Sequence, residues 1–183
     1  MIKPMIPKSV LKKRVKEIAE RITRDYQGES ITLVCILKGG IYFFADLSRQ
    51  IKLDDVRLDF MCVQSYDGTD TTGQLDIRLD LSQPITGKNV IVVEDIIDTG
   101  TTLAYLMDYL MAQSPKSLKL CVLLDKKERR ETETKVNYVG FEIPDEFVVG
   151  YGMDYNQEYR TYPTVGVLKE DAPQRRKKHP IEK

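Results

Sequence analysis

The 183-residue chain has little histidine and little cysteine: it contains one histidine, three cysteines and no tryptophan. The single histidine, His179, lies in a polar stretch near the C-terminal end, which excludes a histidine-based catalytic triad and a zinc site built from several histidines. Each cysteine lies within an apolar run, and no two have Cys-x-x-Cys spacing. Cys35, Cys62 and Cys121 are therefore predicted to be buried thiols of a protein in a reducing compartment.

The chain also lacks an excess of positive or negative charge, and it lacks a long apolar segment. Lysine and arginine number 28, as do aspartate and glutamate, so the overall charge argues against nucleic acid or an acidic membrane as a partner. No apolar run is long enough to span a bilayer, and residues 1–16 are too charged for a signal peptide. With 42% hydrophobic and 31% charged residues, the composition favours one globular domain in the cytoplasm, with neither membrane nor nucleic-acid partner.

A buried strand, a group of acids, a turn of small residues and a helix follow one another in the middle of the chain. The strand is the unbroken apolar run 90–93, of the kind that is buried on both faces of a parallel sheet. Glu94, Asp95 and Asp98 come next, followed by the turn 99–102, which contains only threonine and glycine. The helix is predicted from apolar residues three and four positions apart: Leu103, Leu106, Met107, Leu110 and Met111.

This turn has the chemistry of a phosphate site, and the acids before it have that of a sugar or metal site. Backbone N–H groups at a helix N-terminus favour an anion, and Gly100 allows the anion to approach closely. Further hydroxyl donors come from Thr99, Thr101 and Thr102. Glu94 and Asp95 would repel a phosphate, so sugar hydroxyls and Mg²⁺ are their natural ligands. The stretch predicts a ribose 5-phosphate site; the alternative is an ordinary loop with threonine and aspartate as capping residues.

A second turn of similar character follows the apolar run 31–37. Lys38, Gly39 and Gly40 expose the backbone beside a lysine, and residues 41–51 then have the pattern of a helix. Taken alone, this segment is equally consistent with a plain turn between a strand and a helix.

The central stretch closely resembles the phosphoribosyl pyrophosphate (PRPP) signature of the type I phosphoribosyltransferases, in the form of their hypoxanthine-guanine branch. Residues 90–102 read Val-Ile-Val-Val-Glu-Asp-Ile-Ile-Asp-Thr-Gly-Thr-Thr. Residues 37–40, Leu-Lys-Gly-Gly, reproduce the family's pyrophosphate-binding loop, for which the resemblance implies a non-proline cis peptide bond. Residues 139–155 match the purine-binding region, and the resemblance extends to about Leu168. It implies transfer of the 5-phosphoribosyl group from PRPP to N9 of hypoxanthine or guanine.

The resemblance also implies which residues bind PRPP. Glu94 and Asp95 hold the ribose hydroxyls and orient Mg²⁺, the one cofactor implied. The 5-phosphate is bound by Thr99, Gly100, Thr101 and Thr102. The pyrophosphate is bound by Lys38, Gly39 and Arg160. Thr101 stands where some relatives carry lysine, so no cationic phosphate contact is implied at that position.

The resemblance also implies which residues bind the purine and which residue acts on it. Lys126 binds the 6-oxo group; because an ammonium has donors only, it cannot accept a hydrogen bond from the 6-amino group of adenine. Phe147 stacks on the base, Val148 offers backbone groups to its edge, and Asp154 lies near base and metal. Asp98 takes the N7 proton of the incoming base as general base.

Residues 65–74 contain two glycines, three threonines and no aliphatic side chain, which predicts a loop. The resemblance implies that this loop is a lid over the reacting centre, with Ser65 and Tyr66 as lid residues. The alternative is a plain hairpin connection, because apolar residues alternate along residues 75–81 as in a strand.

The alternation of strands and helices over residues 31–124 predicts an α/β fold. It calls for a parallel, Rossmann-like sheet flanked by helices, with its site at the carboxyl ends of the strands. An amphipathic helix over residues 9–26 precedes the sheet. We expect a single phosphoribosyltransferase-like domain over residues 1–169, with a core at about 30–150 and a small hood from the terminal segments. Residues 170–183 are predicted to be a flexible basic tail.

Two other functions compete with this interpretation. A phosphatase of the haloacid dehalogenase type would use an aspartate loop loosely similar to residues 95–101, but its second acid follows after two positions rather than three. It would also leave the Lys-Gly-Gly turn unexplained. A regulator that senses PRPP without catalysis would need a basic face for RNA or DNA, of which the net charge gives no sign. The expected assembly is a homodimer or a homotetramer.

Overall fold

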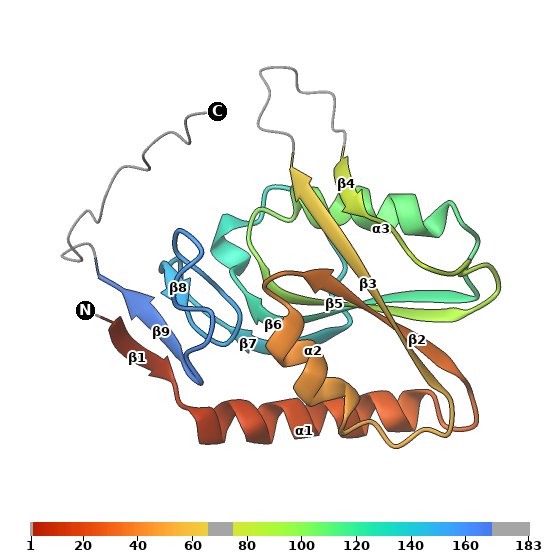
Figure 1. Ribbon diagram of the computed structural model, residues 1–183, viewed down its shortest axis with the longest axis horizontal. Coiled ribbons are helices and arrows are strands. Elements are labelled where there is room, and N and C mark those ends of the chain that lie inside the picture. Colours follow the sequence, from red (N-terminus) through yellow and green to blue (C-terminus); the bar gives the residue numbers. More distant parts are fainter. Residues whose placement is uncertain (1, 66–74, 170–183) are drawn as a thin grey trace, which may run out of the picture.

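The centre of the molecule is a six-stranded sheet (Figure 1). The structure is a computed structural model, and it describes residues 2–65 and 75–169. The strands lie in the order β4-β3-β2-β5-β6-β7, and every neighbouring pair is parallel except β3 with β4. They are β2 (Ile31–Leu37), β3 (Val56–Ser65), β4 (Leu75–Leu79), β5 (Asn89–Ile97), β6 (Ser117–Asp125) and β7 (Tyr138–Glu142).

Helices cover both faces of this sheet, with α1 and α2 on one side and α3 on the other (Figure 1). Along β2 the side chains alternate between these sides. Leu33 and Cys35 belong to the apolar core beneath α1 and α2, whereas Val34 and Ile36 belong to the core beneath α3. The strands are apolar on both faces for this reason. The helices are α1 (Lys8–Asp25), α2 (Ile41–Ser48), α3 (Thr101–Met111) and the short 3₁₀ helix η1 (Lys127–Arg129).

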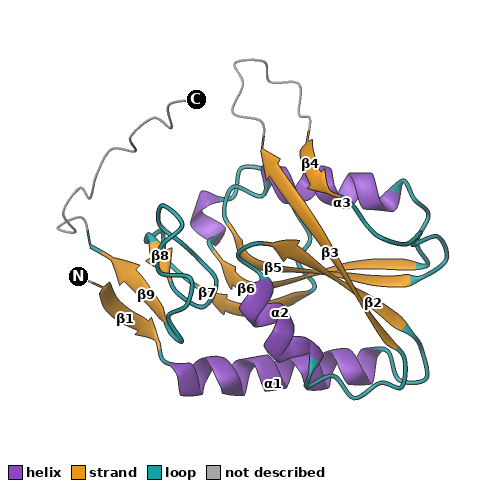
Figure 2. Cartoon of the chain, in the orientation of Figure 1, coloured by secondary structure: helices purple, strands orange, loops and turns teal. Residues whose placement is uncertain are grey.

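A smaller sheet contains both ends of the described chain (Figure 2). Its three antiparallel strands lie in the order β1-β9-β8. Val148 and Val165 belong to the same core as α1 and α2, so this sheet packs onto the larger unit. The predicted combination of a helix-flanked parallel sheet and a hood from the terminal segments is confirmed. The strands are β1 (Ile2–Ile6), β8 (Val148–Val149) and β9 (Val165–Leu168).

Two predicted boundaries are wrong. The helix predicted for residues 41–51 ends at Ser48. The strand predicted to end before the acids continues through them, because β5 keeps its parallel register with β6 to the end of both strands. Glu94 and Asp95 therefore lie within a strand rather than in a turn after it.

The predicted lid residue Tyr66 and the predicted tail, residues 170–183, lie outside the described part of the chain. Ser65, the other predicted lid residue, is the last residue of β3. Strands β3 and β4 flank residues 66–74 and pair with each other, as both the lid and the hairpin alternatives require. Within the described ranges, no helix has the length and hydrophobicity needed to cross a membrane.

The chain leaves the middle of the sheet in two directions. β2 lies between β3 and β5; the connection from β2 leads to β3 on one side, and that from β5 leads to β6 on the other. The carboxyl ends of β2 and β5 are therefore adjacent at a topological switch point, where open α/β sheets bind ligands. The turns that follow these two strands are those that the sequence predicts to bind phosphate groups.

We predict that Arg14 stabilises the outer edge of the sheet. From α1 it donates through Nε to the Gly140 carbonyl at 2.7 Å and through Nη2 to the Val139 carbonyl at 3.0 Å, both in the end strand β7. Arg14→Met keeps much of the apolar length but removes both donors, so the free energy of unfolding should fall by about 1–3 kcal/mol in chemical denaturation. Lys13→Met, on the exposed side of α1, is the control and should change it by less than about 0.5 kcal/mol. Equal losses in the two variants contradict the prediction.

Candidate active site

A cavity of about 210 Å³ lies at the switch point. Its apolar walls come from β2, β3, β5 and α3, namely Ile36, Leu37, Val63, Ile96, Ile97 and Leu103. Its polar lining consists of residues that the sequence predicts for catalysis and for ribose-phosphate binding: Glu94, Asp98, Thr99, Gly100 and Thr102. The fold thus places the predicted general base, Asp98, and most of the predicted phosphate ligands around one cavity.

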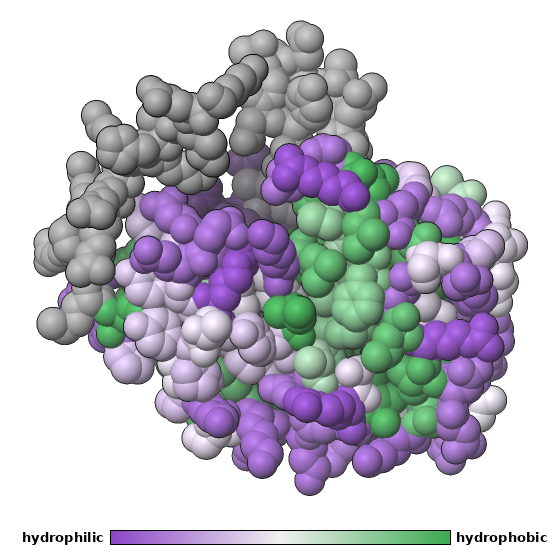
Figure 3. All heavy atoms as spheres, in the orientation of Figure 1, coloured by the Kyte–Doolittle hydropathy of each residue, from purple (hydrophilic) through white to green (hydrophobic). Residues whose placement is uncertain are grey.

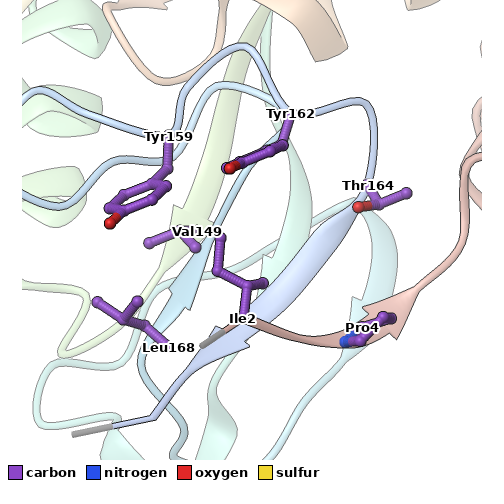
Figure 4. Close-up of a pocket in the computed structure, with 7 residues that line it drawn as sticks. All are labelled: Ile2, Pro4, Val149, Tyr159, Tyr162, Thr164 and Leu168. Carbon is purple, nitrogen blue, oxygen red and sulfur yellow. The ribbon is translucent and has the colours of Figure 1, made fainter. Parts of the chain in front are cut away.

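A larger cavity, about 390 Å³, lies in the hood (Figure 4). Figure 4 shows Tyr159 and Tyr162 on the loop beside the small sheet, and their rings stack with centroids 5.8 Å apart. Val149 and Leu168 contribute apolar surface, and none of the residues that line this cavity is charged. Phosphate and metal ligands require charged or strongly polar partners, so the smaller cavity is the candidate active site.

The turn between β5 and α3 is held through its carbonyl groups. The carbonyls of Asp98, Thr99 and Gly100 accept hydrogen bonds of 2.9–3.3 Å from residues 130–134. The donors are Arg130 Nε, the N–H groups of Glu131 and Thr132, and Thr134 Oγ1. In a trans peptide the N–H group points away from the carbonyl, so the N–H groups of this turn face away from that segment. Gly100 has φ +85° and precedes the 11-residue helix α3, as an anion-binding helix N-terminus requires.

The side chain of Asp95 is buried, and that of Glu94 is half-buried. Asp95 Oδ1 accepts a hydrogen bond from the Ile96 N–H at 2.7 Å, and Glu94 Oε1 accepts one from the Asp95 N–H at 2.9 Å. Burial raises the pKa of both carboxyls, and the charge of Asp95 raises the pKa of Glu94 further. Hydrogen bonds and the Arg160 charge partly oppose the rise in the pKa of Asp95. Such a pair is stabilised by a cation or by hydroxyl donors.

The turn after β2 packs against Asp95 without room for a side chain. A Cβ on Gly39 would lie 1.8 Å from Asp95 Oδ2. A Cβ on Gly152 would lie 1.9 Å from the Gly39 carbonyl oxygen. The Gly39 backbone is therefore enclosed between a carboxylate and the loop after β8. The peptide bond between Leu37 and Lys38 is cis, which confirms the expectation from the family resemblance.

The two cations predicted to bind pyrophosphate converge on one oxygen atom. Lys38 Nζ donates to Gln157 Oε1 at 3.4 Å, and Arg160 Nη2 donates to the same oxygen at 3.3 Å. Arg160 also forms an ion pair of 2.7 Å with Asp154 and donates to the Gly152 carbonyl at 2.8 Å. Lys38 and Arg160 can thus reach a shared acceptor, although they are far apart in the sequence.

The residues predicted to bind the purine lie after β6 and around β8. Lys126 is 6% exposed, and its Nζ lies 3.5 Å from Asp145 Oδ1. Phe147 is 51% exposed, and its ring packs edge-on against Tyr155 with the centroids 5.6 Å apart. Val148 is buried within β8. This region therefore offers a buried ammonium and an open aromatic face.

Asp98 and Thr101, in and beside the turn between β5 and α3, have neighbours that the sequence does not predict. Asp98 Oδ1 lies 3.0 Å from Arg129 Nε in the short helix η1. Thr101 Oγ1 lies 3.1 Å from Thr132 Oγ1, so the hydroxyl of Thr101 faces residues 130–134. Thr101 is absent from the residues that line the cavity in the described chain. Its predicted phosphate contact therefore depends on its N–H group.

The protein side chains alone do not complete a metal site within residues 2–65 and 75–169. No three histidine, cysteine, aspartate or glutamate side chains are placed together there in a way that could hold an ion. The Glu94–Asp95 pair supplies two carboxylates, and Mg²⁺ commonly completes such a set with substrate oxygens and water.

Comparison with known proteins identifies the family. The model of the phosphoribosyl transferase domain matches residues 8–156. The chain belongs to the phosphoribosyltransferase family. It is 46% identical to the hypoxanthine phosphoribosyltransferase of Salmonella typhimurium over 168 residues, which are 90% of this chain and 94% of that protein. It is 43% identical to the hypoxanthine-guanine phosphoribosyltransferase of Streptococcus thermophilus over 159 residues, covering 86% of this chain and 88% of that one.

Solved structures show the same fold. A crystal structure of a hypoxanthine-guanine phosphoribosyltransferase from Bacillus anthracis, with a HEPES molecule in its active site, matches with a TM-score of 0.88 and 48% identity. The match covers 92% of this phosphoribosyltransferase and 100% of that chain. Membership of this family excludes the haloacid dehalogenase interpretation. Because the matched relatives are named as transferases, it also favours an enzyme over a regulator that only senses PRPP.

Sequence reasoning missed several residues that this phosphoribosyltransferase places at its candidate site. Arg129 and Arg130 belong to a charged run that, read alone, is typical of a solvated loop. Asp145 lies in a Pro-Asp-Glu turn, and Gly152 and Gln157 lie in a loop without periodicity. The one available signal is the arginine pair three residues after Lys126, the predicted purine ligand.

We predict that Gly39→Ala impairs the site without unfolding the protein. The new Cβ would overlap the Asp95 carboxylate, so this side chain must move. Because a misplacement of about 1 Å can cost 10²-fold, kcat/KM for the phosphoribosyl donor should fall by about that factor in steady-state assays. Gly28→Ala is the control: φ is +80° there and nothing lies within 4 Å of the added Cβ, so it should cost about 1 kcal/mol of stability but no activity. Unchanged kcat/KM in Gly39→Ala contradicts the prediction.

Proposed function

We propose that this phosphoribosyltransferase transfers the 5-phosphoribosyl group of PRPP to N9 of hypoxanthine or guanine, giving IMP or GMP and pyrophosphate in purine salvage. The observation that carries the proposal is the cavity at the switch point, where an acidic strand end meets a hydroxyl-bearing helix N-terminus. The names of the relatives support the same substrates. The cysteines are free thiols, and the proposed compartment is the cytoplasm.

The phosphoribosyl group is held by the turn between β5 and α3. Thr99, Gly100 and Thr102 surround the 5-phosphate, and Thr101 adds its N–H group. Glu94 accepts hydrogen bonds from the ribose hydroxyls at the wall of the cavity. The carbonyl contacts to residues 130–134 keep the N–H groups of this turn directed at the anion before it arrives, so little reorganisation accompanies binding.

Mg²⁺ is the proposed cofactor, held by Glu94 and Asp95 together with oxygens of PRPP. The two buried carboxyls fit this ion, because each has a raised pKa and lacks a full set of counter-charges among the described residues. When bound, the ion neutralises negative charge that grows on the departing pyrophosphate. Asp95 is itself positioned by the close contact with Gly39.

The pyrophosphate leaves as its bond to C1′ breaks and the bond from C1′ to N9 forms. Lys38, Gly39 and Arg160 bind this leaving group, with the two cations taking a phosphate oxygen in place of Gln157 Oε1. The reaction passes through an oxocarbenium-like state at C1′, and fixed positive charges beside the leaving group stabilise it electrostatically.

The base binds between β6 and the hood. Phe147 stacks on the purine, Val148 offers its backbone groups, and Asp154 lies near base and metal. Lys126 donates a hydrogen bond to the 6-oxo group, and Asp98 takes the proton from N7 as N9 attacks C1′. Ser65, with Tyr66, is proposed to begin a lid over the reacting atoms.

Self-association into a dimer or tetramer is part of the proposal. Figure 3 shows hydrophobic residues gathered in the middle of one face, over the region where Figure 1 draws α2 and β3. Large apolar side chains of these two elements are exposed: Ile41, Tyr42, Leu58 and Phe60. An apolar patch of this kind is typical of an interface between subunits.

The first test of the function is a turnover assay with PRPP, Mg²⁺ and each purine base. Hypoxanthine or guanine should be converted at least about 10³-fold better than adenine, because adenine leaves the Lys126 donor without an acceptor. Omitting Mg²⁺ in the presence of excess EDTA should abolish turnover. Comparable conversion of adenine contradicts the role of Lys126, and full activity in EDTA contradicts the roles of Glu94 and Asp95.

The role of Asp98 is tested by Asp98→Asn, which keeps the shape of the side chain but removes the proton acceptor. Turnover should fall by about 10²–10⁴-fold, while the affinity for PRPP, measured by calorimetry, stays within a few-fold. Asp108→Asn on the exposed side of α3 removes the same charge away from the cavity and should leave both quantities unchanged. A loss of turnover that is explained wholly by lost PRPP affinity would assign Asp98 to PRPP binding instead.

A further inference from the structure

Four side chains of alternating charge cross the candidate active site. Asp98 Oδ1 lies 3.0 Å from Arg129 Nε. Arg129 Nη1 in turn lies 3.5 Å from Asp145 Oδ1, and Lys126 Nζ lies 3.5 Å from that same oxygen. They come from three parts of the fold: Asp98 from the turn after β5, Lys126 and Arg129 from the segment that contains the helix η1, and Asp145 from the loop before β8. The ends of this series are the proposed general base and the proposed ligand of the 6-oxo group.

Arg129 lies against one oxygen of Asp98, while the side chain as a whole stays partly exposed. Oδ1 is buried and, among the described residues, has no hydrogen-bond partner, because the guanidinium lies close to it but is not aligned as a donor. The Asp98 side chain as a whole is 42% exposed, so its exposed surface belongs to atoms other than Oδ1. The position of Arg129 therefore determines which carboxylate oxygen an incoming base meets.

Asp145 is shared between two cations that differ in burial. The Lys126 side chain is only 7% exposed, and a buried ammonium is costly without a counter-charge, which Asp145 supplies. Asp145 uses the same oxygen atom to face Arg129. A ligand that draws Lys126 away from this oxygen leaves Arg129 as the remaining partner of Asp145, so the two cations are coupled through one atom.

We propose that Arg129 is a positioning residue that, through Asp145, couples the binding of a 6-oxopurine at Lys126 to the orientation of Asp98. The inference rests on the proposed function and adds a residue that the family resemblance does not assign. Half-exposed ion pairs are weak in water, but a bound base excludes water from this site and strengthens them. The base is thereby deprotonated by a carboxylate whose orientation depends on recognition of the 6-oxo group.

The test compares Arg129→Gln with Lys127→Gln. Both variants remove one positive charge from η1, but Lys127 pairs with Glu142, at 2.5 Å, and takes no part in the series. Arg129→Gln should lower kcat by about 10–100-fold with the KM for PRPP unchanged, while Lys127→Gln stays within twofold of the wild type. Arg129→Lys should recover part of the loss, because it restores the charge without the fork of the guanidinium.

The decisive measurement repeats Arg129→Gln in the Asp98→Asn background. Because Arg129 is proposed to act through Asp98, the second substitution should then lower kcat no further. An equal fold-loss in both backgrounds would show a merely structural role and overturn the proposal, as would an Arg129→Gln variant that matches Lys127→Gln. The wild-type assay with PRPP and hypoxanthine distinguishes failure of the proposed function from failure of the proposed role of Arg129. Absence of turnover in the wild type overturns the proposed function itself.

Discussion

The parallel pairing of β2 with β5 is the constraint on which the candidate active site depends. Both strands are buried on both faces, so a slip of one residue would exchange their two sets of apolar side chains and is strongly disfavoured. Their register, with Cys35 opposite Val93, sets the two phosphate-type turns at the same edge of the sheet. The contact between Gly39 and Asp95 follows directly from this register.

The hood is part of the site because it supplies charge and close packing that the large sheet lacks. Arg160 and Gly152 come from the loop between β8 and β9, more than a hundred residues after Lys38. Arg160 lies close enough to Asp95 to oppose the effect of burial on its pKa, and Gly152 lies against the Gly39 carbonyl. A distant segment thus brings a cation that partly offsets the cost of burying Asp95.

The segment after β6 contacts both halves of the proposed reaction. Its first residue, Lys126, is the proposed ligand of the purine 6-oxo group. Residues 130–134 donate hydrogen bonds to the carbonyls of the turn between β5 and α3. Arg130 links the two regions: it forms an ion pair with Asp125, the residue before Lys126, and it donates a hydrogen bond to the Asp98 carbonyl. A single connection between β6 and β7 therefore positions groups for the base and for the phosphoribosyl donor relative to each other.

Local pattern alone predicted most of the framework. Unbroken apolar runs predicted β2 and β5, helical spacing predicted α1 and α3, and the small residues after two strands predicted where phosphate would bind. These signals depend on neighbours within a few positions, which the sequence contains in full. The pattern did not predict β1 and β9, because each is short and becomes a strand only by pairing within the small sheet.

The sequence by itself therefore determined the central strands of the large sheet, the main helices and the chemical character of the two turns. Only the tertiary structure decided that Gly39 touches Asp95 and Gly152, that Lys38 and Arg160 reach one oxygen, and that Arg129 covers Asp98. These contacts join residues far apart in the chain, and no local pattern in the sequence predicts them. They arise because close packing of the large sheet, its helices and the hood brings their loops together at the switch point.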